Sequence, residues 1–141
     1  MATVFRTRRQ IEFCDTDMAG IVHFARFFYF MESAETEFLH SLGLSVSMPW
    51  EGKRIGLPRV SARCDYVMPI TFEDFIDIEI EIEKLGNKSI TYVFHFSKEG
   101  KPVAKGVTVA CCVGSNEKRQ MTGIPIPDAF RAKLLAVMHD Q

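Results

Sequence analysis

The sequence contains no long apolar run, almost no net charge and no paired cysteine motif. No uncharged stretch is long enough to span a bilayer, and no apolar run follows the basic residues near the start, so we expect a cytoplasmic protein that is neither secreted nor inserted into a membrane. The 17 basic and 18 acidic side chains give a formal net charge of -1, so no overall field favours nucleic acid or an anionic membrane. Any anionic partner must be bound by a local group of cations.

The cysteines do not form the pattern of a disulfide framework or of a structural zinc site. They are Cys14, Cys64, Cys111 and Cys112, and they include no C-x-x-C pair. Cys111 and Cys112 are neighbours, so their side chains would point to opposite faces of a strand. We interpret all four as reduced, buried cysteines of a cytosolic protein.

Motifs of several enzyme classes are also missing. The histidines His23, His40, His95 and His139 show no H-E-x-x-H or comparable metal spacing, and there is neither a G-x-S-x-G turn nor a glycine-rich phosphate loop. Basic residues do not cluster with aromatic ones. We therefore expect no metal ion, no redox cofactor and no nucleic-acid partner, and we disfavour a metal or serine hydrolase.

The residues that are present predict a single domain over 1–141, since 141 residues with 47% hydrophobic content suffice for one core. A strand is predicted at about residues 4–13, followed by a polar loop ending at Gly20. Apolar residues then recur at helical spacing from Phe24 to Leu42, with Gly43 as the end signal. A loop is expected from Pro49 to Gly56.

Four further strands are predicted, because apolar and polar residues alternate between short turn sequences. They span Val60–Val67, Phe75–Lys84, Ser89–Ser97 and Val103–Val113. A short helix is expected after Pro127, with Phe130, Leu134 and Val137 on one side. The simplest α+β architecture with this order is an antiparallel five-stranded sheet wrapped around one long helix, with a short C-terminal helix.

Acidic residues immediately before the long helix are the first candidates for chemistry. Asp15 and Asp17 precede a helix start whose first N–H groups have no partner within the helix and can polarise a carbonyl oxygen. A nearby carboxylate could attack that carbonyl or deprotonate a water. Gly20 would let the loop approach a ligand closely. On these grounds alone, a capping or turn role for an aspartate here is the more common one.

The segment Ile11-Glu12-Phe13-Cys14-Asp15-Thr16-Asp17-Met18-Ala19-Gly20-Ile21-Val22 resembles the signature of the 4-hydroxybenzoyl-CoA thioesterase family. The similarity continues through the helix and the strand pattern from Leu57 to Val113. It implies a hot-dog fold, acyl-CoA as substrate, and an obligate homodimer that usually pairs into a homotetramer with sites at the subunit boundaries. Asp17 matches the catalytic aspartate of the family, and Asp15 is expected to stabilise the loop.

The resemblance also assigns roles inside and beside the helix. Phe24 aligns where the family uses a backbone N–H to polarise the thioester carbonyl, and its ring is expected in the core or a pocket wall. Glu32 matches an acid close to the acyl group. His23 replaces an aromatic residue of the family and could donate to substrate or water, although a structural role is the more common one for a lone histidine. Glu35 falls near the centre of the apolar face, and we expect a distorted helix or a contact across the dimer there.

The CoA phosphates require cations, and Lys88 and Ser89 resemble the family's phosphate-contacting region at a sheet rim, with Arg59 and Arg63 as further candidates. Two rival interpretations remain: a non-catalytic hot-dog module that binds acyl-CoA, and a hot-dog dehydratase or hydratase, for which the helix shows no obvious His/acid pair. The many phenylalanines suit an aromatic acyl group as well as a short or medium aliphatic chain. Whether Asp17 acts as nucleophile or general base is open.

Overall fold

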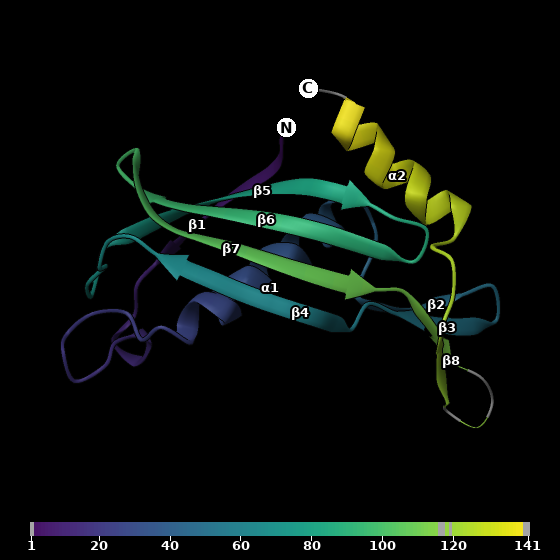
Figure 1. The fold of residues 1–141 in the computed structure, drawn as a ribbon, viewed down its shortest axis with the longest axis horizontal. Coiled ribbons are helices and arrows are strands. Elements are labelled where there is room, and N and C mark those ends of the chain that lie inside the picture. The colour runs from purple at the N-terminus through teal and green to yellow at the C-terminus, as the bar shows by residue number, and fades with distance from the viewer. Residues whose placement is uncertain (1, 116–117, 119, 140–141) are drawn as a thin grey trace.

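The largest element of the protein is an antiparallel sheet of five strands (Figure 1). The computed structural model describes residues 2–115, 118 and 120–139. The strands are β1 (Thr3–Gln10), β4 (Arg59–Tyr66), β5 (Phe75–Leu85), β6 (Ser89–Lys98) and β7 (Lys101–Cys111). Their order is β1-β5-β6-β7-β4, and every neighbouring pair is antiparallel. The predicted five-stranded sheet is confirmed.

The long helix α1 (Arg26–Ser41) lies along one face of this sheet (Figure 1). Its buried residues recur at helical spacing and are Phe27, Phe30, Met31, Ala34, Glu35, Phe38 and Leu39. Gly43, which lies two residues beyond the end of the helix, has a φ of 74°. The N–H of Gly43 donates to the His40 carbonyl at 3.0 Å and that of Leu44 to the Leu39 carbonyl at 2.8 Å. This pair of bonds is a Schellman motif, which confirms the predicted stop.

Strand β5 shows why the sheet has one buried face. Ile76, Ile78 and Ile80 are 0% exposed and pack into the core. The alternate residues point to the other face, where Asp77 accepts a hydrogen bond from Arg8 of β1 at 2.9 Å. The alternation in the sequence therefore predicted both faces of this strand correctly.

A second, four-stranded sheet was not predicted. It is ordered β2-β3-β8-β9 and consists of β2 (Ser47–Trp50), β3 (Lys53–Gly56), β8 (Val113–Ser115) and β9 (Met121–Gly123). The loop expected at Pro49–Gly56 is instead a hairpin whose two turn residues, Glu51 and Gly52, have φ values of 48° and 78°. Positive φ at both positions is the signature of a tight hairpin turn. The strand expected up to Val113 is correspondingly split at Cys112.

The start of the chain also differs from the prediction. Strand β1 ends at Gln10, and Phe13–Asp15 form the 3-10 helix η1, because Ile11 turns into the core and donates its N–H to the Asp74 carbonyl at 2.8 Å. The long helix begins at Arg26 instead of Phe24. These differences lengthen the segment between β1 and α1, in which the predicted catalytic residues lie.

The C-terminal helix α2 (Asp128–His139) is confirmed, with Phe130 and Leu134 buried and Val137 packed against the core. Arg131 ties it to the β5–β6 turn by donating to the carbonyls of Gly86 and Asn87. Neither helix of the described chain has the length and apolar character needed to cross a membrane.

Candidate functional site

The segment before α1 is held as a tight loop with Asp17 at its tip. Thr16 and Val22 form an antiparallel bridge, the Asp17 N–H donates to the Ile21 carbonyl at 2.9 Å, and the Gly20 N–H donates to the Asp17 carbonyl at 3.0 Å. Gly20 has a φ of 82°, a conformation that glycine adopts without strain. The bridge brings the Asp17 turn beside the chain that leads into α1.

The Asp17 carboxylate is half-buried and only partly engaged. Its Oδ1 accepts the Ala19 N–H at 2.8 Å, which is an Asx turn of the kind that stabilises loops. Its Oδ2 accepts no hydrogen bond from the described residues. One oxygen of the Asp17 carboxylate therefore stabilises the turn, and the other is free to take part in a reaction.

Asp15 stabilises this loop, as predicted. Its carboxylate is 2% exposed, accepts the Glu12 N–H at 2.8 Å and pairs with Arg26 of α1 at 2.7 Å. Glu12, Cys14 and Asp15 bring three potential metal-ligand atoms within 4.8 Å of one another. Because Asp15 is already bonded to Arg26 and to a backbone N–H, these contacts explain the cluster without an ion.

All four cysteines are free, but they are not uniformly buried. Cys112 is buried and Cys64 and Cys111 are half-buried, whereas Cys14 is exposed. The prediction of buried cysteines is therefore wrong for Cys14, because η1 turns that residue outward beside Glu12.

The N–H of Phe24 is unpaired among the described residues, although the peptide groups on both sides of it are held by hydrogen bonds. The His23 carbonyl, which shares a peptide plane with the Phe24 N–H, accepts the Arg26 N–H at 2.9 Å. The next N–H, that of Ala25, donates to His23 Nδ1 at 3.1 Å. Within the described chain, the Phe24 N–H itself has no partner. A fixed, unpaired N–H is what electrostatic stabilisation of a developing oxyanion requires.

The side chains of His23 and Phe24 lie on the surface. Their rings stack with centroids 4.7 Å apart, and the Phe24 side chain is 64% exposed. The expectation that this ring lies in the core is thus wrong for the single chain. Since His23 Nδ1 accepts the Ala25 N–H, its proton in the neutral state is on Nε2.

Glu32 lies on α1, beside the β1 edge of the sheet. It is exposed on α1 and lines a cavity of about 550 Å³ together with Asp15, Arg26 and residues of β1. Phe24, by contrast, contacts β4, and β1 and β4 are the opposite edges of the sheet. The structure therefore places Asp17, His23 and Phe24 in the segment between η1 and α1, and Glu32 on α1 beside the β1 edge of the sheet.

Glu35 faces the core, and our expectation of a distorted helix or a contact across a dimer was wrong. The side chain is 2% exposed, and its Oε1 accepts hydrogen bonds from Arg59 Nε at 3.0 Å and Nη2 at 2.5 Å. Burial raises the pKa of the Glu35 carboxyl, and the Arg59 charge opposes that rise. Arg59, predicted to contact CoA, is thus committed to a buried ion pair.

Three buried polar atoms around this pair have no hydrogen-bond partner among the described residues: Glu35 Oε2, the Tyr92 hydroxyl and Thr108 Oγ1. Tyr92 and Thr108 are direct partners on β6 and β7, so their side chains emerge side by side. Burial, followed by the Glu35 charge, raises the pKa of Tyr92 well above its usual value. The core beneath α1 is therefore polar around Glu35.

The predicted phosphate contacts lie at the other end of the sheet. Ser89 pairs with Cys111 at one end of β7, whereas Tyr66, which contacts Phe24, pairs with Ala104. Seven residues of strand separate Ala104 from Cys111, which is roughly 23 Å. Lys88 is exposed at the rim, and Arg63 is exposed on β4. One chain does not bring Lys88 and Ser89 to Asp17.

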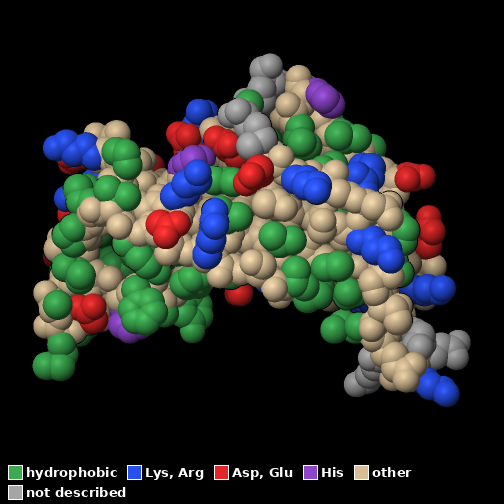
Figure 2. Space-filling view, viewed as in Figure 1, with side chains coloured by type: hydrophobic (Ala, Val, Ile, Leu, Met, Phe, Trp, Pro, Cys, Tyr) green, Lys and Arg blue, Asp and Glu red, His purple; other side chains and the backbone are tan. Residues whose placement is uncertain are grey.

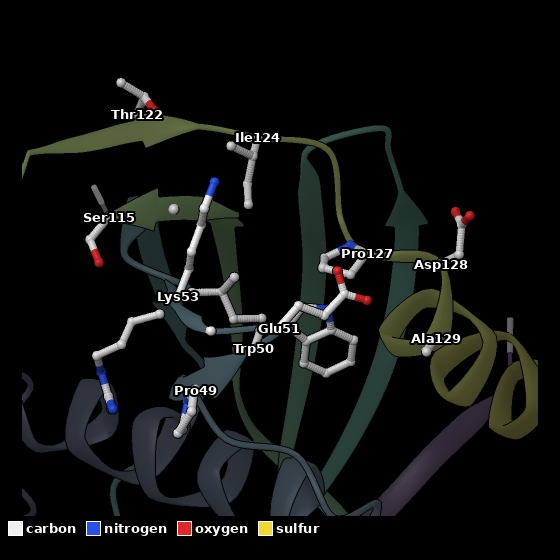
Figure 3. A pocket seen from close by; sticks show the side chains of 14 residues that line it. Pro49, Trp50, Glu51, Lys53, Ser115, Thr122, Ile124, Pro127, Asp128 and Ala129 are labelled. Atoms are coloured by element: carbon white, nitrogen blue, oxygen red, sulfur yellow. The ribbon is translucent and has the colours of Figure 1, made fainter. Parts of the chain in front are cut away.

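A larger cavity, of about 1380 Å³, lies between the second sheet and the start of α2 (Figure 3). Trp50, Pro127 and Asp128 line one part of it, and the Lys53 side chain crosses β8 (Figure 3). None of the predicted site residues lines this cavity. It depends on the β2–β3 hairpin, which the sequence had suggested to be a loop.

Exposed apolar side chains gather at the end of the molecule that carries the Asp17 loop, as the space-filling view shows at its left side (Figure 2). Near Asp17 and Phe24 these exposed residues include Phe13, Met18, Val67 and Phe72. Exposed apolar residues gathered in this way mark a binding or interaction surface.

Tyr66 is a site residue that sequence reasoning missed. Its hydroxyl donates to the Phe24 carbonyl at 2.7 Å, and its ring packs edge-on against Phe27 with centroids 5.1 Å apart. The contact spans 42 residues of sequence, so no local pattern could reveal it. An aromatic residue at the end of a predicted strand was the only available signal.

Comparison with known proteins is consistent with this geometry. Residues 11–134 match the family model described as the thioesterase-like superfamily. A 1,4-dihydroxy-2-naphthoyl-CoA hydrolase of Synechococcus elongatus is 30% identical over 128 residues, covering 90% of this chain and 92% of the relative. The acyl-CoA thioesterase YbgC of Haemophilus influenzae is 23% identical over 125 residues, covering 89% and 87%. The structure of the gentisyl-coenzyme A thioesterase BH1999 superposes with a TM-score of 0.75 at 27% identity, covering 93% of this chain and 99% of that one.

Proposed function

Because the chain belongs to the thioesterase-like superfamily and has the hot-dog fold, we propose that it is a thioester hydrolase that cleaves an acyl-CoA to the free acid and CoA. The observation that carries this proposal is the free Phe24 N–H, fixed by its neighbours beside a loop that presents one oxygen of Asp17. These are the two groups that thioester hydrolysis needs at one place: a donor for the carbonyl oxygen and a carboxylate for the carbonyl carbon or for water.

In the proposed mechanism, the thioester carbonyl oxygen accepts a hydrogen bond from the Phe24 N–H, and negative charge that develops on it is stabilised there. Asp17 either attacks the carbonyl carbon, giving an anhydride that water then hydrolyses, or removes a proton from the attacking water. In both routes the C–S bond breaks. In the general-base route the proton that Asp17 takes from water can pass to the leaving sulfur, and in the anhydride route CoA leaves as the thiolate and takes its proton from solvent. The Nε2–H of His23 is an imidazole donor on this loop, and in this mechanism it donates a hydrogen bond to the substrate or to the water.

An aromatic acyl group is the proposed substrate class. Two relatives are named for gentisyl-CoA and 1,4-dihydroxy-2-naphthoyl-CoA, and both of these thioesters have a hydroxylated aromatic acyl group. The sequence also resembles 4-hydroxybenzoyl-CoA thioesterases. The exposed apolar residues around Phe24 suit an apolar acyl group of either kind, so the aromatic class rests on the relatives. Short and medium aliphatic acyl groups are the alternative.

We also propose that the complete site forms between two copies of the single 1–141 domain. Lys88 and Ser89, proposed to bind CoA phosphates with help from Arg63, are roughly 23 Å along the sheet from the Tyr66–Phe24 contact. Strand β4 is an edge of the sheet, Val60 in it is 66% exposed and Val67 directly after it is 71% exposed, and such an edge is a template for pairing. A homodimer, pairing further into a homotetramer, would bring the two ends together and give Glu32 of one copy access to the acyl group of the other.

The test is the release of free thiol from a panel of aromatic and aliphatic acyl-CoAs. Asp17→Asn keeps an oxygen for the Ala19 N–H, so the turn is preserved while the carboxylate is lost. We expect kcat to fall by about 10³-fold or more, since a missing catalytic group costs that much in comparable enzymes. Asp77→Asn, which removes an exposed carboxylate of β5, is the control.

Three outcomes are informative. Turnover of aromatic acyl-CoAs that Asp17→Asn abolishes and Asp77→Asn preserves supports the proposal. Turnover that Asp17→Asn leaves intact would overturn the mechanism but not the activity. Tight acyl-CoA binding without turnover of any substrate would identify a non-catalytic acyl-CoA-binding module.

A further inference from the structure

Tyr66 links the edge of the large sheet to the backbone of the proposed active site. It is the last residue of β4, its hydroxyl donates to the Phe24 carbonyl at 2.7 Å, and its ring packs against Phe27 in the first turn of α1. Both ends of the side chain are thus fixed by the segment that begins the helix.

Each of the two peptide groups that flank Phe24 is held by hydrogen bonds. The plane that contains the Phe24 N–H is fixed at its carbonyl end, where His23 accepts the Arg26 N–H. The following plane is fixed at both ends, because the Phe24 carbonyl accepts the Tyr66 hydroxyl and the Ala25 N–H donates to His23 Nδ1. Of these three contacts, that of Tyr66 comes from the sheet, and the other two come from the chain between His23 and Arg26.

We propose that Tyr66 is a positioning residue for thioester hydrolysis, which fixes the Phe24 backbone so that its N–H points at the substrate carbonyl. This inference rests on the proposed function, since it concerns the N–H that the proposed mechanism uses. Without the hydroxyl, rotation about the Phe24 backbone would be restrained only from within the loop. Misplacement of a catalytic donor by about 1 Å can lower a rate by about 10²-fold.

The role requires the hydroxyl to stay protonated. Burial, and then the neighbouring Cys64, raise the pKa of Tyr66 to about 12. The Cys64 thiol is raised to a pKa of about 11, mainly by burial, so it is neutral as well in the range where enzymes are usually assayed. Removing the Tyr66 hydroxyl should therefore lower kcat by the same factor at every pH from about 6 to 9.

The experiment compares Tyr66→Phe with Tyr29→Phe in steady-state hydrolysis of the preferred acyl-CoA. Phenylalanine keeps the ring that packs on Phe27 and removes only the hydrogen bond. Tyr29 is a matched control, since its side chain is also exposed near the start of α1 and its ring contacts Arg26. We expect Tyr66→Phe to lower kcat roughly 10- to 100-fold with KM changed less than about twofold, and Tyr29→Phe to change kcat little.

A second measurement follows the Phe24 amide directly. In protein labelled with ¹⁵N-phenylalanine, Tyr66→Phe should shift the Phe24 amide resonance and speed its hydrogen exchange, whereas Tyr29→Phe should not. A purely structural role predicts a lower unfolding midpoint or a raised KM with unchanged kcat, and that result would overturn the inference. Wild-type turnover with equal kcat in Tyr66→Phe would also overturn it, while absence of wild-type turnover would remove the proposed function and this inference together.

Discussion

The Glu35 carboxylate, buried under the long helix, is held by the Arg59 guanidinium of the edge strand β4 through two N–H groups at 3.0 and 2.5 Å. The pair joins the middle of α1 to the same strand that ends at Tyr66. The Arg59 side chain is 27% exposed and can be hydrated, whereas the Glu35 side chain is only 2% exposed. The Glu35 charge therefore depends on this ion pair more than the Arg59 charge does. The helix and the strand that contacts Phe24 are therefore coupled at two points.

Arg59→Met should destabilise the fold. It leaves the Glu35 carboxylate in the core with no cation, and removal of one partner of a buried pair costs about 3 kcal/mol. Arg63→Met, on the exposed face of the same strand, should cost no more than about 0.5 kcal/mol. The free energy of unfolding at pH 7 is measured by urea titration. A loss for Arg59→Met no larger than that of the control would show that the pair contributes nothing.

Replacing both partners tests the origin of that loss. In the double variant Glu35→Leu with Arg59→Met, no buried charge remains, and the stability should recover most of what Arg59→Met alone removes. Failure to recover would mean that packing of the Arg59 stem, and not the unpaired charge, is responsible.

The raised pKa of Glu35 predicts a pH dependence with a definite sign. Because the folded state holds the Glu35 proton more tightly than the unfolded chain, the wild type binds more protons when folded, and its stability falls as pH rises from about 4.5 through the raised pKa. Glu35→Gln cannot titrate there. The difference in unfolding free energy, wild type minus Glu35→Gln, should therefore decrease over this interval.

The groups around Glu35 allow that difference to be assigned. Arg59 stays charged throughout, the pKa of Tyr92 is raised well above 10, and Glu32 on the same helix adds a further negative charge. Urea titrations at several pH values between about 4 and 8 measure the effect. The prediction would be contradicted if the unfolding free energies of the two proteins changed with pH in parallel, or if that of the wild type rose relative to that of Glu35→Gln as pH increased.

The sequence was most informative where one face of an element is buried. The isoleucines of β5 and the phenylalanines of α1 follow simple periods, and Gly43 ends the helix through a local backbone motif. The second sheet was missed because its strands have three or four residues, with Pro49 inside β2 and Gly52 in the turn after it, and both residue types usually mark loops. Nothing local distinguishes a short hairpin of this kind from an irregular loop.

The site was partly predictable for a similar reason. Asp15, Asp17 and Phe24 lie in one continuous segment, so their proximity follows from the chain itself. The partners that fix them do not: Arg59 is 24 residues from Glu35, and Tyr66 is 42 residues from Phe24. Contacts across such separations depend on how the sheet is paired, which no single segment specifies.

The role proposed for Phe24 belongs to its backbone, and a pair of substitutions separates backbone from side chain. Phe24→Ala keeps the N–H and removes an exposed ring, so kcat should change by less than about tenfold. Phe24→Pro removes the N–H, which has no partner within the described residues, and should lower kcat by about 10²- to 10³-fold, the usual loss for one oxyanion donor. Steady-state rates with one acyl-CoA, together with unfolding midpoints, measure both effects. Equal rates for Phe24→Pro and Phe24→Ala in folded proteins would show that this N–H does not bind the carbonyl, and the donor would then have to be sought elsewhere on the loop.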